Sequence, residues 1–422
     1  MNRRMSTALA VTVAAGLVTG GWLYARAGAD SVPAGSITLV AADYGANGTH
    51  PSQAYWDQVV AAFHREHPRV TVHVQVYDWN DIGAKLDEMV RDKQYPDIVE
   101  GPSSAAWAKQ GLLYPAYQVT GNGAVQMRLV PSLQATGGGD TAASAVPFVS
   151  SSRAFLINDK LWQQAGLPMA QGKAVAPRTW AEVEQAARRM KAAGVPVPLG
   201  LPLGPEEAQA ELFMWEMNNR GGYADPSGTW TVDSPQNRAT LAQLKRWVDA
   251  GLTEHAPATV NRTALYADFA AGRVGMLNGT PIQLADIQQN ALDVTWAPLP
   301  AAQEGQDPQT LGVADWISAF KPGGHQQQIQ AFLQFVYQKQ WQVQFDKEYD
   351  LLPVTLDALD QMRAEQPELS PFIDALSEAR FMPADLPGWS AVAKAVQSGA
   401  GQLLDDPQGL AAVQQAATRG TG

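Results

Sequence analysis

Hydrophobic and polar positions follow two different periods along the first hundred residues. Residues 36–42 (SITLVAA) form a short apolar run and residues 70–77 (VTVHVQVY) alternate apolar and polar side chains, which predicts two β-strands. Residues 55–67 carry apolar side chains at helical spacing, and a second helix is predicted from about residue 81 to residue 93. A third short strand follows at residues 97–99. This β-α-β-α-β order predicts an α/β protein whose sheet is connected by crossover helices.

Polar and aromatic residues stand where each of these three strands ends. Asp43 and Tyr44 follow the first strand, Trp79 follows the second, and Glu100 follows the third. The carboxyl ends of parallel strands meet at one edge of a sheet, and ligands bind in the crevice beyond that edge. The sequence therefore predicts that the three loops converge on one ligand-binding edge.

The rest of the chain continues the mixture of strands and helices. Residues 146–158 are predicted to form one strand, and Thr179 and Glu182 form a capping box that opens a helix ending near residue 193. Ser234 and Pro235 begin a further helix that ends at Gly251. A β run at residues 274–277 then stops at Asn278. The last third is mostly helical, with helices predicted over residues 326–347, 371–380 and 389–397.

The N-terminus is typical of an exported protein. Arg3 and Arg4 precede an apolar stretch of about 16 residues, which is shorter than the ~20 residues of a membrane-spanning helix, and Ala25-Arg26-Ala27 follows. We therefore expect a secretory signal peptide that is cleaved after Ala27; an uncleaved membrane anchor is the alternative. The chain contains no cysteine, so the protein is not expected to be a lipoprotein.

Charge and motifs exclude several classes of function. The formal net charge is −11, and it becomes −14 without residues 1–27, which hold three basic residues and no acidic one, so nucleic acid is an unfavourable partner. The absence of cysteine excludes thiolate zinc sites and a catalytic thiol. Nucleophile-elbow, phosphate-loop and dinucleotide-binding motifs are missing. His64 and His67 lack a third ligand, so no metal or other cofactor is predicted.

Tryptophan is the distinctive residue type, with 13 in the chain. Trp180 and Trp247 lie in amphipathic helices and are predicted to be core residues. Trp79, Trp316 and Trp389 instead stand beside polar residues at loops or helix starts. An aromatic face can cover the apolar face of a sugar ring while neighbouring polar groups bind its hydroxyls. The composition is thus compatible with a carbohydrate-binding cleft.

Longer segments then occur in a recognisable order along the chain: YPDIVEGPSSAAWAKQGLLYPA, VPFVSSSRAFLINDKLWQQAGL, APRTWAEVEQAARRM, NNRGGYADPSGTWTVDSPQNRATLAQLKRWVDAGL, TALYADFAAGRVGMLNGTP and LGVADWISAFKPGGHQQQIQAFLQFVYQKQWQVQF. In this order they resemble the extracellular solute-binding proteins of ABC importers, and specifically the maltose-binding type that carries sugars and oligosaccharides. The resemblance covers nearly all of the chain after the signal peptide.

The resemblance implies a two-lobed periplasmic-binding-protein fold of the α/β class, with hinge strands and a ligand cleft between the lobes. The chain would cross between lobes near residues 147–152, near 311–314 and near 358. Both lobes are then discontinuous. The implied organisation is a signal peptide (1–27), an N-terminal linker (28–35), lobe 1 (36–147 and 312–358) and lobe 2 (148–311 and 359–422).

The resemblance also implies a set of ligand-binding residues. Together with Trp79 at the second strand end, they are Asp43, Tyr44, Glu100, Ser151, Arg153, Glu207, Asn278, Gly279, Asp315, Trp316 and Trp389. The maltose binder has aromatic residues where this chain has Gly101-Pro102 and Pro281-Ile282, so the identity of the sugar is not predicted.

Five of these residues also have a purely structural interpretation. Asn278-Gly279 would be a turn, Arg153 part of a hinge salt bridge, Glu100 a charge at a helix N-terminus, and Trp389 a core residue.

The function expected from the sequence is that of a periplasmic or extracytoplasmic receptor without catalytic activity. It would bind a sugar or oligosaccharide, close around it, and deliver it as a monomer to the membrane permease subunits of an ABC importer. Two alternatives remain open at this stage. One is the same fold binding a non-sugar solute, such as a glycerol phosphodiester or a polyamine; the other is an exported carbohydrate-active enzyme that uses two carboxylates.

Overall fold

The computed structural model describes residues 32–45, 51–101, 105–134, 144–384 and 386–419. The predicted signal peptide and the first residues of the predicted linker lie outside these ranges. Among the helices formed by these described residues, none combines the length and the apolar character needed to cross a membrane.

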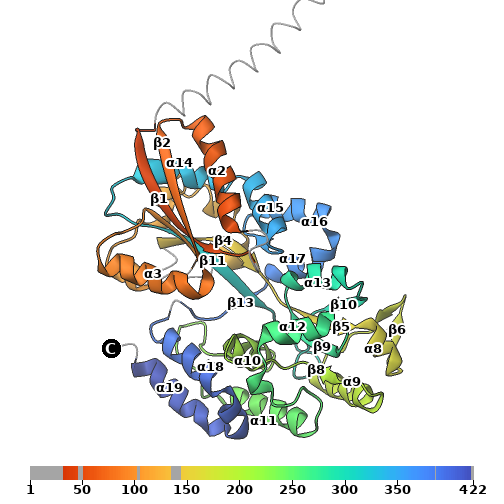
Figure 1. Ribbon diagram of the computed structural model, residues 1–422. Helices are drawn as coiled ribbons and strands as arrows, with labels where there is room; N and C mark the ends of the chain where they lie inside the picture. Colours follow the sequence, from red (N-terminus) through yellow and green to blue (C-terminus); the bar gives the residue numbers. More distant parts are fainter. Residues whose placement is uncertain (1–31, 46–50, 102–104, 135–143, 385, 420–422) are drawn as a thin grey trace, which may run out of the picture.

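The first lobe is built on the larger sheet, which has the strand order β12-β4-β11-β3-β1-β2, with β13 paired to β11 (Figure 1). The β1 strand pairs in parallel with β2 and with β3, whereas β11 runs antiparallel to β3 and β4. The predicted β-α-β-α-β start is therefore confirmed. The strands are β1 (Gly35–Asp43), β2 (Val70–Asp78), β3 (Ile98–Gly101), β4 (Ala145–Ser151), β11 (Leu311–Ala319), β12 (Leu352–Pro353) and β13 (Arg380–Phe381).

Helices from both ends of the chain cover this sheet. The core beneath them is rich in aromatic residues: Trp56 of α2 stacks on Phe148 of β4 with ring centroids 5.5 Å apart, and Phe345 of α15 packs edge-on against the same phenylalanine. The helices are α2 (Ser52–Glu66), α3 (Trp79–Arg91), α4 (Ala105–Lys109), α5 (Ala116–Val119), α6 (Pro131–Gln134), α14 (Gln326–Val336), α15 (Lys339–Glu348) and α16 (Leu356–Glu365).

The second lobe is built on a four-stranded sheet with the order β10-β5-β9-β8. Its strands are β5 (Ala154–Asn158), β8 (Val197–Leu199), β9 (Val274–Gly279) and β10 (Val294–Ala297), and a small hairpin, β6 (Met169–Ala170) with β7 (Lys173–Ala174), lies beside it. The surrounding helices are α8 (Asp159–Gln164), α9 (Trp180–Ala192), α10 (Ala208–Met217), α11 (Pro235–Asp249), α12 (Arg262–Ala270), α13 (Leu284–Gln289), α17 (Ser370–Leu376), α18 (Trp389–Asp405) and α19 (Leu410–Arg419) (Figure 1).

Both faces of the second sheet are buried, each in a different core. Phe155 and Ile157 of β5 point into the core formed with α9, α10 and α11. Leu156 between them points to the opposite face, together with Leu277 of β9, into a core that continues through α17 and α16 into the first lobe. The side chains of a strand alternate between faces, so an uninterrupted apolar run such as AFLI fits a strand that is covered on both sides.

The local helix signals are confirmed. The Thr179 hydroxyl accepts a hydrogen bond from the Glu182 amide, while the Glu182 carboxylate accepts from the Thr179 amide, which completes the predicted capping box at α9. The Ser234 hydroxyl likewise caps α11. Trp180 and Trp247 are buried core residues whose rings meet edge-on at 6.0 Å, as expected from their helices.

Two predicted elements are each divided into two in the structure. The single strand predicted over 146–158 is two strands that belong to different sheets, because Ser152 and Arg153 carry the chain from one lobe to the other. The Ser152 hydroxyl donates to the carbonyl of Phe372, 2.7 Å away, which fixes this crossing. The helix predicted over 326–347 is also two helices, since the chain between them is extended at Gln338.

Helices α5, α6, α10, α13, α16 and α19 have no counterpart in the sequence prediction. Residue 358, the predicted third crossing, lies inside α16, which packs on α15 and β12 of the first lobe. The next helix, α17, contacts β5 of the second sheet.

Candidate functional site

The three strand-end loops meet at one edge of the first sheet. Asp43 at the end of β1 is in register with Asp78 at the end of β2, and Ala41 of β1 is in register with Glu100 of β3. On the other side of β3, Gly101 pairs with Trp316 of β11. The predicted convergence of these loops is confirmed, and β11 places further side chains beside them.

The middle of β11 is where this edge reaches solvent. Residues 313–316 are partly exposed, although the residues on both sides of them in the strand are buried. A β-bulge interrupts the pairing of β11 with β4 between Asp315 and Trp316. Bulges change the direction of side chains and are frequent near binding sites. The exposed stretch lies between the part of β11 that contacts the second lobe and the part that is buried in the first.

Tyr44 joins two carboxyl groups at this edge. Its hydroxyl lies 2.8 Å from Oε1 of Glu100 and 3.1 Å from Oδ2 of Asp315. Burial, with help from the neighbouring negative charge, raises the pKa of Glu100 well above its usual range and that of Asp315 to about 7. The Trp79 ring meets the Tyr44 ring edge-on, with centroids 5.4 Å apart. At neutral pH this cluster therefore carries fewer negative charges than its sequence implies.

Glu100 is fully buried, and protein groups already occupy both of its oxygens: Tyr44 donates to Oε1, and the Ala42 amide donates to Oε2 over 3.3 Å. Asp43 has a similarly structural environment. Its Oδ1 accepts from the amides of Gly45 and Ser52, so it holds the start of α2 in place. These two carboxylates fix the position of Tyr44.

Arg153 lies on the crossing between β4 and β5 and is 4% exposed. Its Nη1 donates to the Ser151 hydroxyl over 2.9 Å and to the Ser152 carbonyl over 3.3 Å. Among the ion pairs of the described residues none involves Arg153, so the hinge salt bridge considered from the sequence is not formed in this conformation. Burial lowers the pKa of Arg153, and the charge of Glu207 acts in the opposite direction.

Glu207 stands at the start of α10 and pairs with a residue that sequence reasoning missed. Arg262 of α12 donates to Oε2 of Glu207 and, over 3.2 Å, to Oε1 of Glu206. The guanidinium carbon of Arg262 also lies 5.7 Å from the ring centroid of Tyr266. Glu206 and Glu207 are thus both ion-paired, so Arg262 already holds Glu207, which the resemblance implies as a ligand contact.

Asn278 and Gly279 belong to strand β9, so the interpretation as a simple turn is wrong. The Asn278 side-chain amide donates to Oε1 of Glu211 over 2.8 Å, and the Trp215 indole donates to the same oxygen. Burial raises the pKa of Glu211 to about 8. The Oδ1 atom of Asn278 is buried and has no partner among the described residues. A Cβ on Gly279 would come within 2.6 Å of Leu156, so close strand packing requires glycine there.

Electrostatic interactions connect the two lobes at this junction. The charge of Glu207, from the second lobe, contributes to the raised pKa of Asp315 on the first sheet, and Arg153 opposes it. Tyr44, Asp315, Arg153, Glu207 and Glu211 therefore form one electrostatically coupled group around the crossing strands.

Trp389 packs against the second apolar core. It is the first residue of α18, is partly buried, and its ring lies 5.4 Å from that of Tyr223. This packing agrees with part of the core interpretation. A cavity of about 670 Å³ elsewhere in the second lobe contains none of the residues predicted from the sequence.

Three residues of the junction were not predicted: Glu211, Arg262 and Tyr266. The sequence held a signal only for Glu211, which is a single carboxylate within the apolar run AELFMW. Such a residue on a helix that is buried all around needs partners, and Asn278 and Trp215 supply them.

The fold defines the class of protein. The chain aligns with the GacH receptor of Streptomyces glaucescens, which was solved without ligand and with acarbose, at a TM-score of 0.73 and 20% identity, over 92% of this chain and 98% of that one. It aligns with the cyclic α-maltosyl-1,6-maltose binding protein of Arthrobacter globiformis at a TM-score of 0.74 and 17% identity, over the same shares. The predicted two-lobed binding-protein fold of the maltose-binding type is confirmed.

The family follows from the sequence. The model of the bacterial extracellular solute-binding protein family matches residues 47–343, and the chain belongs to this family. A binding protein of Brucella abortus strain 2308 is 26% identical over 388 residues, which are 90% of each chain. The sn-glycerol-3-phosphate-binding periplasmic protein of Brucella melitensis is also 26% identical, but over 289 residues, or 65% of each chain.

Proposed function

We propose that this protein is an extracytoplasmic receptor that binds an oligosaccharide at the junction of its two lobes and delivers it to an ABC importer. The observation that carries the proposal is the coupled group at the crossing strands. Tyr44 and Asp315 come from the first lobe, Arg153 from a crossing, and Glu207 with Arg262 from the second lobe. A ligand that bridges them favours closure of the lobes, because it gains contacts that the open form lacks.

The chemistry of the junction suits a neutral, hydroxyl-rich ligand. Asp315 is partly exposed and has a raised pKa, so it can donate as well as accept hydrogen bonds, and hydroxyl groups do both. Trp79, which follows β2, and Trp316 of β11 are both partly exposed aromatic residues near this edge of the first sheet. Structural neighbours that bind acarbose and cyclic maltosyl-maltose support the same ligand class.

The lobe boundaries belong to the proposal as well. Residues 36–147 and 312–358 would form lobe 1, and residues 148–311 and 359–422 lobe 2. The placement of β4 and β11 in the first sheet and of β5, β8, β9 and β10 in the second supports the first two crossings. The position of 358 inside α16 favours a third crossing between α16 and α17, a few residues later.

The receptor would act without catalysis, after export through a cleaved signal peptide, and as a monomer that docks on permease subunits. Membership in the extracellular solute-binding family supports the location and the permease partner. The environment of Glu100 argues against a pair of catalytic carboxylates, because this side chain is fully buried and both oxygens are occupied by Tyr44 and Ala42.

Calorimetric titration of the purified protein with a panel of oligosaccharides tests the ligand class. The panel includes linear and cyclic α-glucans, with sn-glycerol 3-phosphate, glycerophosphocholine and spermidine as non-sugar probes. We expect saturable binding of at least one oligosaccharide, release of unchanged sugar, and a more compact shape in small-angle X-ray scattering. Binding of a phosphodiester or a polyamine alone would favour a non-sugar receptor, and cleaved sugar would indicate an enzyme.

Substitution of aromatic residues tests the location of the site. Trp316→Ala removes a partly exposed ring at the junction, and we expect the affinity for the oligosaccharide to fall by roughly tenfold or more, which is about 1.4 kcal/mol. Tyr117→Ala is the matched control, because Tyr117 is an exposed aromatic residue on α5. Equal affinities of the two variants would place the sugar elsewhere.

A further inference from the structure

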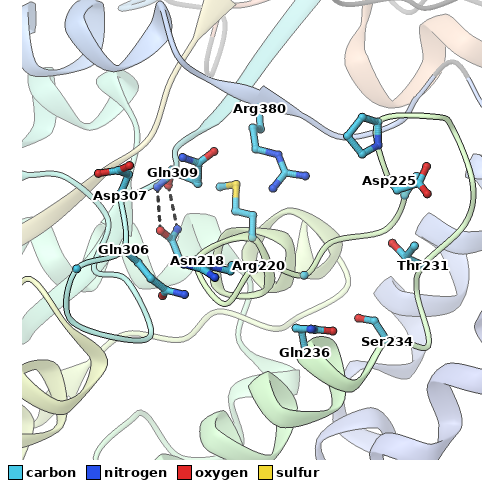
Figure 2. Close-up of a pocket in the computed structure, with 15 residues that line it drawn as sticks. Asn218, Arg220, Asp225, Thr231, Ser234, Gln236, Gln306, Asp307, Gln309 and Arg380 are labelled. Carbon is cyan, nitrogen blue, oxygen red and sulfur yellow. Dashed lines mark hydrogen bonds between the residues drawn. The ribbon is translucent and has the colours of Figure 1, made fainter.

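A cavity of about 670 Å³ lies in the second lobe at the C-terminal end of α10 (Figure 2). Its walls are the end of α10, the following loop that reaches the start of α11, residues 305–309, and Arg380 of β13. Small-molecule sites commonly enclose about 300–1,000 Å³. None of the residues that form the coupled group at the lobe junction lines it.

Hydrogen bonds hold the walls of this cavity in place. The Gln309 amide donates to Oδ1 of Asn218 and the Asn218 side-chain amide donates to the Gln309 carbonyl, both over 2.9 Å (Figure 2). On the opposite side, the fully buried Asn237 accepts from the Gly222 amide over 2.9 Å and donates to the Gly222 carbonyl over 3.0 Å. The cavity is thus formed before any ligand enters, which lowers the cost of binding.

Arg380 has an unusual environment for a charged side chain. Figure 2 shows its guanidinium pointing into the cavity. The ring centroid of Phe213 lies 6.0 Å from its Cζ atom. Within the part of the chain that the structure describes, no side-chain hydrogen bond and no ion pair is formed by Arg380. A partly buried guanidinium without a carboxylate is a costly arrangement unless an anion can reach it.

The carboxylates of the cavity wall do not serve as its partner. Oδ1 of Asp225 accepts from the Ser227 amide, the Ser227 hydroxyl and the Thr229 amide, so it stabilises its own turn. Burial is the cause that lowers the pKa of Arg380; a nearby carboxylate would raise it. Asp307, on the other wall, is exposed to solvent. The Arg380 guanidinium therefore forms no ion pair with either carboxylate and can pair with an anionic ligand.

The remaining polar groups of the cavity suit hydroxyls. Gln236 and Ser234 lie on the side opposite to Arg380, and Thr231 lies between them and Asp225 (Figure 2). Amides and hydroxyls can each donate and accept, as alcohol groups do. We propose that this cavity is a second ligand site, separate from the lobe junction, for a small hydroxyl-bearing molecule with one anionic group, a carboxylate or a phosphate, which Arg380 binds.

The proposal does not depend on the oligosaccharide proposal, because it concerns different residues. Calorimetric titration with matched pairs of probes tests it: D-glucuronate against D-glucose, glucose 6-phosphate against glucose, and inorganic phosphate alone. A charge-assisted hydrogen bond favours the anion by roughly 10- to 100-fold in affinity. Preference for glucuronate would identify the carboxylate as the anionic group, and preference for glucose 6-phosphate or phosphate would identify the phosphate.

Variants locate the site. We expect Arg380→Gln to abolish the preference for the anionic probe and to leave oligosaccharide binding unchanged. Arg153→Gln, at the lobe junction, should leave anion binding unchanged, as should Arg91→Gln, whose side chain is 70% exposed on α3. Equal affinity for charged and neutral probes, no saturable binding of any probe, or loss of anion binding in Arg153→Gln would each overturn the proposal.

If Arg380→Gln does not fold, a crystal structure of the unmodified protein with the preferred anionic probe tests the proposed second site. Density in the cavity with the anionic group against Arg380 supports the proposal. Density only at the lobe junction, or none, contradicts it.

Discussion

Asp315→Asn replaces one carboxylate at the lobe junction by an amide of the same shape. The Tyr44 hydroxyl, 3.1 Å from Oδ2 of Asp315, can still donate to the amide oxygen. The substitution therefore removes the titration of the group and keeps its main contact. It tests whether the ionised form of Asp315 destabilises the folded protein to an extent that depends on pH.

The magnitude follows from the pKa of Asp315. Burial, then the charge of Glu207, raises this pKa from 3.8 to about 7, in spite of the hydrogen bond from Tyr44 and the charge of Arg153. A difference of about three units corresponds to about 4 kcal/mol at 1.36 kcal/mol per unit. Asp315 keeps part of its surface in water, which screens its charge. We therefore expect about 2 kcal/mol.

The sign follows from proton linkage. The folded protein holds the Asp315 proton more tightly than the unfolded chain does, so this group favours folding below pH ~4, and that contribution is lost as the pH rises through about 7. The variant has no such dependence. Below pH ~3.5 the two proteins should have similar free energies of unfolding; the variant should gain stability relative to the parent as the pH rises and be more stable by about 2 kcal/mol at pH 8.

Urea unfolding at a series of pH values, followed by tryptophan fluorescence and circular dichroism, measures this difference. Asp360→Asn is the control, because Asp360 is exposed on α16 and its variant should differ from the parent by a constant amount. A difference between Asp315→Asn and the parent that does not change between pH 4.5 and pH 8, or that falls, would refute the reasoning.

Three further predictions use other parts of the fold. Glu211→Gln should be close to neutral below pH ~4.5 and increasingly stabilising as the pH rises to about 8, by up to about 5 kcal/mol, because burial raises the pKa of Glu211 from 4.5 to about 8; a pH-independent difference in urea unfolding would contradict this. Thr179→Ala should cost about 1 kcal/mol of unfolding free energy, and Thr179→Ser should restore it, since both hydroxyls can cap α9. Gly388→Ala should cost about 2 kcal/mol or more and increase amide hydrogen exchange in α18 and α19, because φ is +94° and a Cβ would lie 2.3 Å from the Ala417 carbonyl oxygen; unchanged exchange would argue against this contact.

Local sequence patterns predicted most of the elements of the first lobe and several helices of the second. The alternation in residues 70–77 and the Thr179–Glu182 capping box each depend on residues only a few positions apart, and both are found in the structure. These local patterns failed where they do not show which way the chain turns. Residues 146–158 read as one apolar strand, but Ser152 and Arg153 divide it between two sheets through contacts with Phe372 and Thr310.

The candidate site was likewise predicted only in part from the sequence. The order of strands determined that Asp43, Trp79 and Glu100 end at one edge, because parallel strands with crossover helices leave no other arrangement. The sequence could not show that the Tyr44 hydroxyl lies between Glu100 and Asp315, because Asp315 is 271 positions away along the chain.

Sequence patterns alone were therefore sufficient to predict the fold class, the family and the edge of the sheet at which the candidate ligand-binding residues lie. These features depend on hydrophobic periodicity and on the order of elements, and both can be recognised in the amino-acid sequence. Tertiary packing was needed to show that Glu100 is buried, that Arg262 pairs with Glu207, and that Arg380 faces a cavity whose carboxylates do not pair with it. Burial and long-range pairing set the charge state of each group, and neither exists until the chain has folded.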